Sequence, residues 1–118
     1  MRVLVFEDTY DVEAMLESAG VDLRAHIVLQ RWNSNEPVEQ IEKFAPDVVL
    51  LDFFMPPHTG LQVLKLLNKA VNEETIHRPQ HVIGISSEAH ANELMKTEGA
   101  DDVIIKFELH SLSIWNEL

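Results

Sequence analysis

The sequence contains no cysteine, few basic residues and no long hydrophobic run. Without cysteine the chain forms neither a disulfide framework nor a thiolate metal site. A membrane-spanning helix needs about 20 consecutive apolar residues, and a secretory signal needs a basic start followed by an apolar stretch; the chain has neither. We therefore expect a soluble, cytoplasmic protein that does not contact a membrane.

Basic residues are also too few for general binding to nucleic acid. The 9 lysine and arginine residues are scattered among 20 acidic residues, and the formal net charge is -11. Proteins that bind DNA or RNA electrostatically need a concentrated basic face, so we expect no direct nucleic-acid partner. What the chain does have is 46% apolar residues in 118, enough for one core. We expect a single domain over residues 1–118, with no output module.

Apolar residues alternate between strand-like and helix-like spacing along the chain. Short apolar runs predict strands at residues 3–6, 25–32, 47–51, 81–85 and 103–105. Helical spacing, with glycine or proline near several ends, predicts helices at residues 12–19, 37–45, 61–71, 88–97 and 109–118. This alternation predicts an α/β fold with a parallel sheet, right-handed crossovers and helices on both faces.

Acidic, hydroxyl and basic side chains follow four of these strands. Glu7 and Asp8 follow the first strand, Asp52 the third, Ser86 the fourth and Lys106 the fifth. An open α/β sheet places its chemistry at the carboxyl ends of its strands, so we expect these side chains to meet. Each has an ordinary alternative: the acidic pair as a solvated turn or helix cap, Ser86 as a helix cap, and Lys106 as a surface lysine. Their joint placement favours a functional site.

Asp52 is the candidate nucleophile of this set. A carboxylate can accept a phosphoryl group covalently, provided that the crowded negative charge is neutralised. Glu7, Asp8 and Asp52 would repel one another, and a hard divalent cation such as Mg²⁺ would relieve that repulsion. Lys106 and Ser86 would supply the ammonium and hydroxyl groups that stabilise a phosphoryl group in transfer.

At these positions the chain resembles the receiver domain of two-component response regulators over essentially its whole length. The resemblance is carried by residues 3–8, 48–56, 60, 85–86, 99–102 and 105–106. It implies a flavodoxin-like, doubly wound sheet of strand order 2-1-3-4-5. It also implies that Asp52 is phosphorylated by a sensor histidine kinase or a histidine phosphotransfer protein. Mg²⁺ would be bound by Asp8, Asp52 and the Phe54 backbone carbonyl, with Glu7 contributing mostly through water.

The resemblance also implies how the phosphorylated state is read. In the family, the hydroxyl residue moves inward and an aromatic residue three positions before the lysine turns with it. That movement remodels a face that corresponds here to residues 88–97, 103–105 and 109–118, through which a downstream protein would bind. The aromatic position is Val103 in this chain, so the aromatic side chain that turns in the family is missing here. The oligomeric state is expected to be a monomer or a phosphorylation-dependent homodimer.

A second departure follows the lysine. The family usually has a proline with a cis bond there, whereas this chain has Phe107. A cis bond before a residue other than proline costs about 3 kcal/mol. Either the bond is therefore trans and Lys106 shifts, or strain is retained.

Aromatic residues near the site and in the last helix have two interpretations each. Phe53 and Phe54 could form a binding patch, but we expect one to pack in the core and the other to face the acidic pocket. Trp115 could anchor a partner, but we expect it to cover the sheet.

The leading hypothesis is a stand-alone phosphoacceptor receiver, not a turnover enzyme, that signals through a protein-interaction surface. Phe54, two residues after Asp52, borders the path of the attacking water, and its bulk predicts slow autodephosphorylation. The same position lacks the second acid that aspartyl-phosphate hydrolases generally require. The alternative is a phosphorylation-independent, receiver-like interaction module, suggested by Val103 and Phe107.

Overall fold

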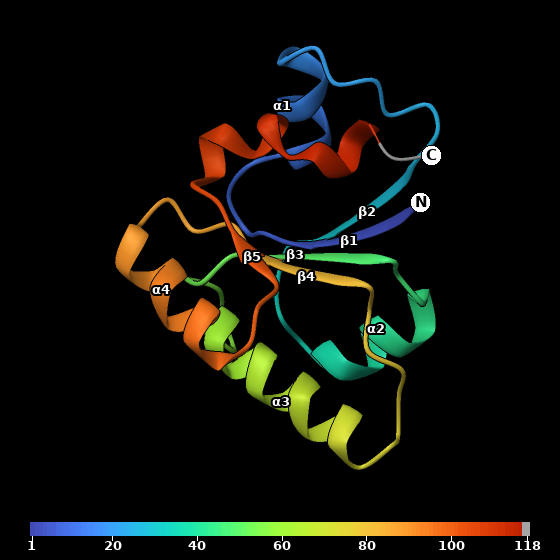
Figure 1. Ribbon diagram of the computed structural model, residues 1–118, viewed down its shortest axis with the longest axis vertical. Coiled ribbons are helices and arrows are strands. Elements are labelled where there is room, and N and C mark those ends of the chain that lie inside the picture. The colour runs from blue at the N-terminus through green and yellow to red at the C-terminus, as the bar shows by residue number, and fades with distance from the viewer. Residues whose placement is uncertain (117–118) are drawn as a thin grey trace.

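The computed structural model describes residues 1–116, which form one five-stranded parallel sheet in the order β2-β1-β3-β4-β5 (Figure 1). The strands are β1 (Arg2–Phe6), β2 (Ile27–Arg31), β3 (Val48–Leu51), β4 (His81–Gly84) and β5 (Asp102–Val103). The predicted flavodoxin-like strand order is confirmed. The last strand is shorter than predicted and begins one residue earlier.

Helices cover both faces of the sheet. They are α1 (Val12–Ser18), α2 (Pro37–Phe44), α3 (Gly60–Asn72), α4 (Ala89–Glu98) and two 3₁₀ helices, η1 (Lys106–Ser111) and η2 (Ser113–Asn116). In Figure 1, α1 and the C-terminal 3₁₀ helices lie above the sheet, and α2, α3 and α4 lie below it. None of the helices in the described part of the chain has the length and apolar character needed to cross a membrane.

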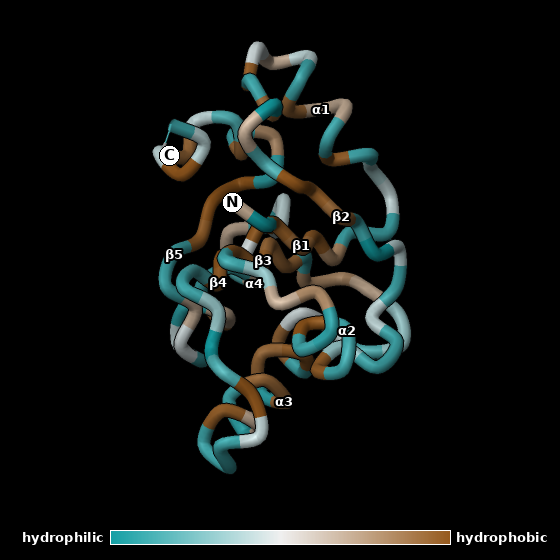
Figure 2. Tube along the Cα trace, turned by 90° about the vertical axis from the view of Figure 1, so that its right-hand side faces the viewer, coloured by the Kyte–Doolittle hydropathy of each residue, from teal (hydrophilic) through white to brown (hydrophobic). Residues whose placement is uncertain are grey.

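The two faces of the sheet have separate hydrophobic layers. Successive strand residues point to opposite faces, so Val3 and Val5 pack in the layer with α1, whereas Leu4 and Phe6 pack in the layer with α2, α3 and α4. All four residues of β3 are buried, as its continuous apolar run predicts. Figure 2 shows the resulting concentration of hydrophobic residues in the central strands.

The predicted helix over residues 109–118 is wrong within its described part. Instead, η1 and η2 are separated by Leu112, whose φ of -64° and ψ of 136° are extended. Leu109, Leu112 and Trp115 recur every three residues and are all buried, a spacing that suits the three residues per turn of a 3₁₀ helix. Trp115 therefore covers the sheet, as expected. Residues 117–118 of the predicted helix lie outside the described residues.

Local signals position the helix that follows β3. Thr59 and Gln62 form a capping box, in which the Thr59 hydroxyl accepts a hydrogen bond from the Gln62 N–H at 3.1 Å. A Cβ atom at Gly60 would overlap the Asp52 carbonyl oxygen. Glycine at this position therefore lets α3 begin directly against the backbone of Asp52.

Candidate functional site

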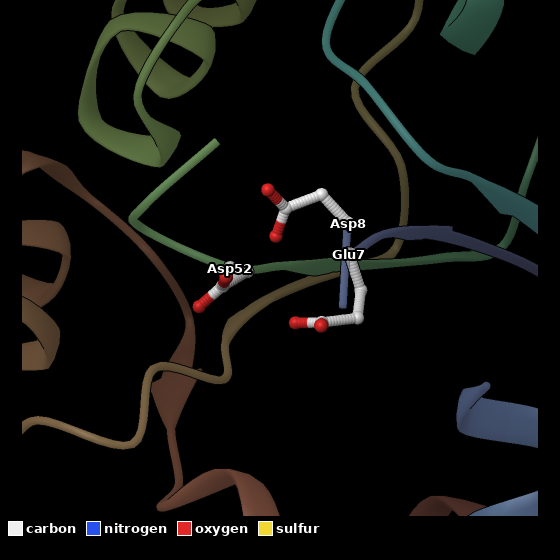
Figure 3. Close-up of side chains that lie close together, drawn as sticks. All are labelled: Glu7, Asp8 and Asp52. Carbon is white, nitrogen blue, oxygen red and sulfur yellow. The ribbon is translucent and has the colours of Figure 1, made fainter. Parts of the chain in front are cut away.

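Three carboxylates meet at the carboxyl ends of β1 and β3 (Figure 3). One carboxylate oxygen each from Glu7, Asp8 and Asp52 lie within 4.8 Å of one another. Glu7 is fully buried, Asp52 is 3% exposed and Asp8 is half-buried. The two strands run in parallel with Phe6 opposite Leu51, so the residues that follow them are brought together as predicted.

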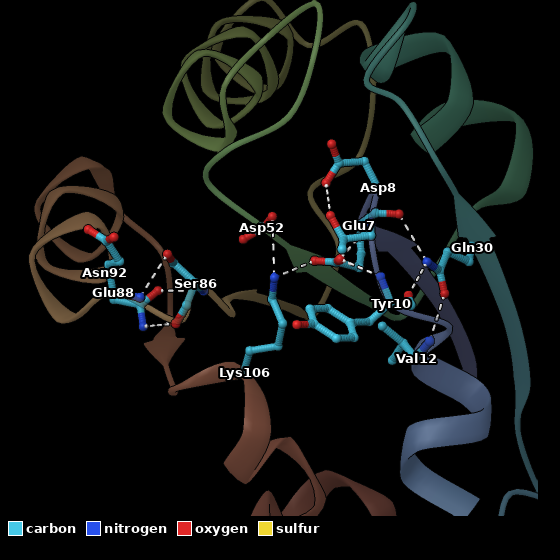
Figure 4. A network of polar contacts seen from close by, with 11 residues as sticks. Glu7, Asp8, Tyr10, Val12, Gln30, Asp52, Ser86, Glu88, Asn92 and Lys106 are labelled. Carbon is cyan, nitrogen blue, oxygen red and sulfur yellow. Dashed lines mark hydrogen bonds and ion pairs between the residues drawn. The ribbon is translucent and has the colours of Figure 1, made fainter.

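Lys106 lies between two of these carboxylates (Figure 4). Its Nζ atom is 2.7 Å from Glu7 Oε1 and 3.5 Å from Asp52 Oδ2. It also lies over the Tyr10 ring, 5.4 Å from the ring centroid. Lys106 is only 5% exposed, so the alternative of a surface lysine is wrong.

The bond between Lys106 and Phe107 is trans. Of the two alternatives for this bond, the trans form is therefore the one observed, and Lys106 reaches both Glu7 and Asp52. Phe107 is 52% exposed, and its ring makes an edge-to-face contact with Tyr10 at a centroid distance of 5.3 Å. The sequence alone did not indicate that Tyr10 borders the site.

Burial and pairing set the proton affinities of the three central groups. Burial raises the pKa of Asp52 to about 6; the charge of Lys106 opposes this rise and that of Glu7 adds to it. Burial also acts to raise the pKa of Glu7, but the hydrogen bond from Lys106 and the N–H groups of Tyr10 and Thr9 lower it overall. Burial acts to lower the pKa of Lys106, but Glu7 and Asp52 raise it overall.

Ser86 is not brought into contact with Asp52. Its hydroxyl is buried and accepts a hydrogen bond from the Glu88 N–H at 3.1 Å, next to the start of α4. No hydrogen bond in residues 1–116 joins this hydroxyl to Asp52 or Lys106, and Figure 4 shows Ser86 facing Glu88 and Asn92 instead. The ordinary alternative of a helix cap is not observed either, because the N-cap of α4 is Glu88 and no side chain caps this helix.

Gln30 organises the acidic turn and was not predicted. Its Nε2 atom donates to the carbonyl oxygens of Glu7 at 2.9 Å and Tyr10 at 2.7 Å, and its Oε1 atom accepts from the Val12 N–H at 2.9 Å. One side chain on β2 therefore holds the whole turn from β1 to α1. The only sequence signal was an amide next to the apolar residues of a strand that ends at Arg31.

Ser34 holds the turn that follows Asp52. It is fully buried, and its hydroxyl donates to the His58 carbonyl at 2.7 Å and accepts from the His58 N–H at 2.8 Å. These bonds join the loop after β2 to the loop after β3. A lone serine in a loop has no sequence pattern that would indicate this role.

The adjacent phenylalanines divide between interior and surface. Phe53 is half-buried and packs against the layer with α2, α3 and α4, whereas Phe54 is 54% exposed. Their rings meet at a centroid distance of 4.9 Å and an angle of 64°. The expectation that one of the pair packs in the core is confirmed for Phe53.

No protein-family model matches the chain. Among curated proteins, protein PilH of Pseudomonas aeruginosa is 31% identical over 109 residues, which are 89% of this chain and 84% of PilH. A protein-glutamate methylesterase/protein-glutamine glutaminase of Agrobacterium fabrum is 30% identical over 109 residues. The match covers 92% of this chain but only 27% of that longer protein.

Solved structures show the same architecture. The response regulator domain of Thermotoga maritima CheB has a TM-score of 0.67 and 29% identity, covering 90% of this chain and 78% of that one. A DNA-binding response regulator of the LuxR family from Staphylococcus aureus has a TM-score of 0.72, covering 98% of both chains, and at 23% identity it supports the fold alone. The shared fold and the match to nearly all of PilH lead to one conclusion: the chain belongs to the response regulator receiver family.

Proposed function

We propose that this receiver is a cytoplasmic phosphoacceptor of a two-component phosphorelay, formed as one domain by residues 1–118. The observation that carries the proposal is the position of Lys106 Nζ, 3.5 Å from Asp52 Oδ2, beside two further acids. A buried carboxylate that lies next to a lysine ammonium group, within a cluster of acidic residues, suits a covalent phosphoryl acceptor. The donor would be a sensor histidine kinase or a histidine phosphotransfer protein.

The proposed chemistry assigns one task to each group. An Asp52 carboxylate oxygen attacks phosphorus, the phosphorus–nitrogen bond of the donor phosphohistidine breaks, and the imidazole leaves with the electron pair. Lys106 pairs with a phosphoryl oxygen and offsets its charge. The Ser86 hydroxyl donates to another phosphoryl oxygen after it turns away from the Glu88 N–H. Glu7 holds Lys106 in place through its 2.7 Å contact.

Asp8, Asp52 and the Phe54 carbonyl would hold Mg²⁺, with Glu7 contributing mostly through water. Carboxylate oxygens within 4.8 Å of one another, with Asp8 open to solvent, fit a hard cation that keeps several waters. When bound, the ion supplies positive charge that offsets the carboxylates and the incoming phosphoryl group. Response regulator TrrA of Thermotoga maritima, a neighbour of 22% identity and TM-score 0.64, was solved in complex with Mg²⁺-BeF.

The test is labelling with acetyl phosphate in the presence of Mg²⁺, followed by intact-mass measurement. The wild type should gain one phosphoryl group, and Asp52→Ala should gain none. Asp22→Ala is the matched control, because Asp22 is an exposed acid whose carboxylate pairs with Arg24, and it should label like the wild type. An unlabelled wild type, or equal labelling of Asp52→Ala, would disprove the proposal.

Phe54 provides a second prediction, on the lifetime of the phosphorylated state. A large apolar side chain two residues after the acceptor neither activates nor positions a water, so the label should persist for minutes. Phe54→Asn should shorten that lifetime, because an amide can hold the attacking water, whereas Leu66→Ala on exposed α3 surface should not. The decay is measured after removal of acetyl phosphate, and loss of the wild-type label within seconds would contradict the prediction.

A second candidate function is a phosphorylation-independent interaction module. The observation that favours it is the replacement of the final α-helix by η1 and η2 beside β5, on the face proposed to bind a downstream protein. In that case, Mg²⁺ with beryllofluoride would occupy the Asp52 site and leave the amide NMR resonances of α4 and β5 unchanged.

The proposed receiver acts either as a monomer or as a phosphorylation-dependent homodimer. Sedimentation with and without beryllofluoride distinguishes these two states.

A further inference from the structure

Asn92 uses its whole side-chain amide to hold the turn that carries Ser86. It lies on α4 and is 4% exposed. Its Oδ1 atom accepts from the Ser86 N–H at 2.9 Å, and its Nδ2 atom donates to the Ser86 carbonyl at 3.0 Å. The same Nδ2 atom donates to the Ile104 carbonyl at 3.1 Å. Three backbone groups of two chain segments thus depend on one side chain.

These contacts stand where the backbone ladder between β4 and β5 ends. The last rung is the hydrogen bond from the Ile104 N–H to the Gly84 carbonyl, at 2.9 Å. Beyond it, Asn92 bridges the two segments in place of a backbone bond. Gly84 makes room for this approach, since a Cβ there would lie 3.3 Å from Asn92 Oδ1 and 2.8 Å from Met95 Cε.

Asn92 therefore touches the segments that carry two groups of the proposed phosphoryl site. One bears the Ser86 hydroxyl, and the other leads from Ile104 to Lys106 two residues later. If Ser86 moved alone, its N–H, its carbonyl and the Asn92 amide would all lose buried partners. Unpaired buried polar groups are costly, so Ser86 and Asn92 are expected to move together.

We propose that Asn92 is a positioning residue that makes α4 move with Ser86 when a phosphoryl group is bound at Asp52. This inference rests on the proposed phosphoacceptor function. Through Asn92, the phosphoryl site is connected to α4 without an aromatic side chain on β5. The residue at the aromatic position is Val103, which is half-buried against the layer with α2, α3 and α4. The bond from Asn92 to the Ile104 carbonyl extends the connection to the residue that follows β5.

The experiment compares amide NMR spectra with and without Mg²⁺ and beryllofluoride for the wild type, Asn92→Ala and Asn68→Ala. Asn68 is the matched control, because its side chain also joins α4 through a backbone carbonyl, that of Glu98 at 2.9 Å, at the other end of the helix. In the wild type, resonances of Asp52, α4 and β5 should shift. In Asn92→Ala, the Asp52 shift should persist while the α4 and β5 shifts are lost. Asn68→Ala should respond like the wild type.

The Ser86→Ala variant separates positioning from a merely structural role. It keeps the Ser86 N–H and carbonyl groups that Asn92 binds and removes only the hydroxyl, so the α4 shift should be lost although the Asn92 bonds remain. If Asn92→Ala does not fold, Asn92→Asp keeps the acceptor for the Ser86 N–H and should retain part of the α4 shift. A full α4 response in Asn92→Ala overturns the inference while leaving the proposed function intact. A wild-type site that does not bind beryllofluoride overturns both.

Discussion

The Lys106→Met variant is expected to lose about 3–5 kcal/mol of unfolding free energy at pH 7, because it leaves buried carboxylates without their cation. Glu7 is fully buried and Asp52 nearly so, and Lys106 lies 2.7 Å from one and 3.5 Å from the other. Methionine keeps most of the length of the side chain, so the loss reports mainly on charge. Urea unfolding of the metal-free protein measures it.

Two controls make this result specific. Lys65→Met removes an exposed lysine whose Nζ lies 4.0 Å from a Glu98 carboxylate oxygen, and such pairs contribute about 1 kcal/mol or less. Adding Asp52→Asn to Lys106→Met should recover part of the loss, because one of the unpaired charges is then gone. The deficit should also shrink in acid, since without Lys106 both carboxyl groups protonate more readily in the folded state. A deficit equal to that of Lys65→Met would show that Lys106 is not the required counter-charge.

The Asp52→Asn variant is expected to be more stable than the wild type in the absence of metal. Burial raises the pKa of Asp52 from 3.8 to about 6, with the charge of Glu7 adding to the rise and Lys106 opposing it. At pH 7 the ionised carboxylate therefore lowers folded-state stability by about 3 kcal/mol, since one pKa unit corresponds to about 1.4 kcal/mol. Asparagine has nearly the same shape without the charge, and it leaves Lys106 paired with Glu7.

The pH dependence of this difference follows from the direction of the shift. Because the folded pKa of Asp52 is above the unfolded value, the folded state binds the proton first as pH falls, and wild-type stability rises through the window from about 6 down to 3.8. The advantage of Asp52→Asn should therefore be present at pH 7 and disappear near pH 4. Glu7 has a lowered pKa, so its stabilising effect is lost in acid, but this loss is common to both proteins.

Added Mg²⁺ should reverse the order of the two proteins. A ligand that binds only the folded state stabilises it by mass action, and Asp52→Asn removes one of the proposed carboxylate ligands. Thermal unfolding with increasing Mg²⁺ should raise the wild-type Tm well above that of the variant, whereas Ca²⁺-free, Mg²⁺-free buffer should give the opposite order. If Asp52→Asn is less stable than the wild type without metal, the ionised Asp52 carboxylate does not lower the stability of the folded state, and the prediction is wrong.

Most helices and strands could be predicted from the sequence because the spacing of apolar residues and the positions of turn residues are local signals. Apolar period and turn residues predicted every strand and four of the helices, and parallel pairing then required Glu7, Asp8 and Asp52 to converge. The final helix could not be predicted in the same way. Its leucine and tryptophan residues satisfy both helical spacing and the three-residue repeat, and only packing against the sheet favours the repeat seen in η1 and η2.

The sequence by itself determined the order of the elements and which acidic and basic groups stand at the strand ends, because side-chain alternation and strand direction depend on neighbours along the chain. Only the tertiary structure decided how those groups are held. Gln30 bonds to backbone atoms 18 to 23 residues away, Ser34 to backbone atoms 24 residues away, and Asn92 to backbone atoms 6 to 12 residues away. Nothing in a single sequence marks such partners, since any neutral polar side chain can satisfy a backbone group that folding happens to bring within reach.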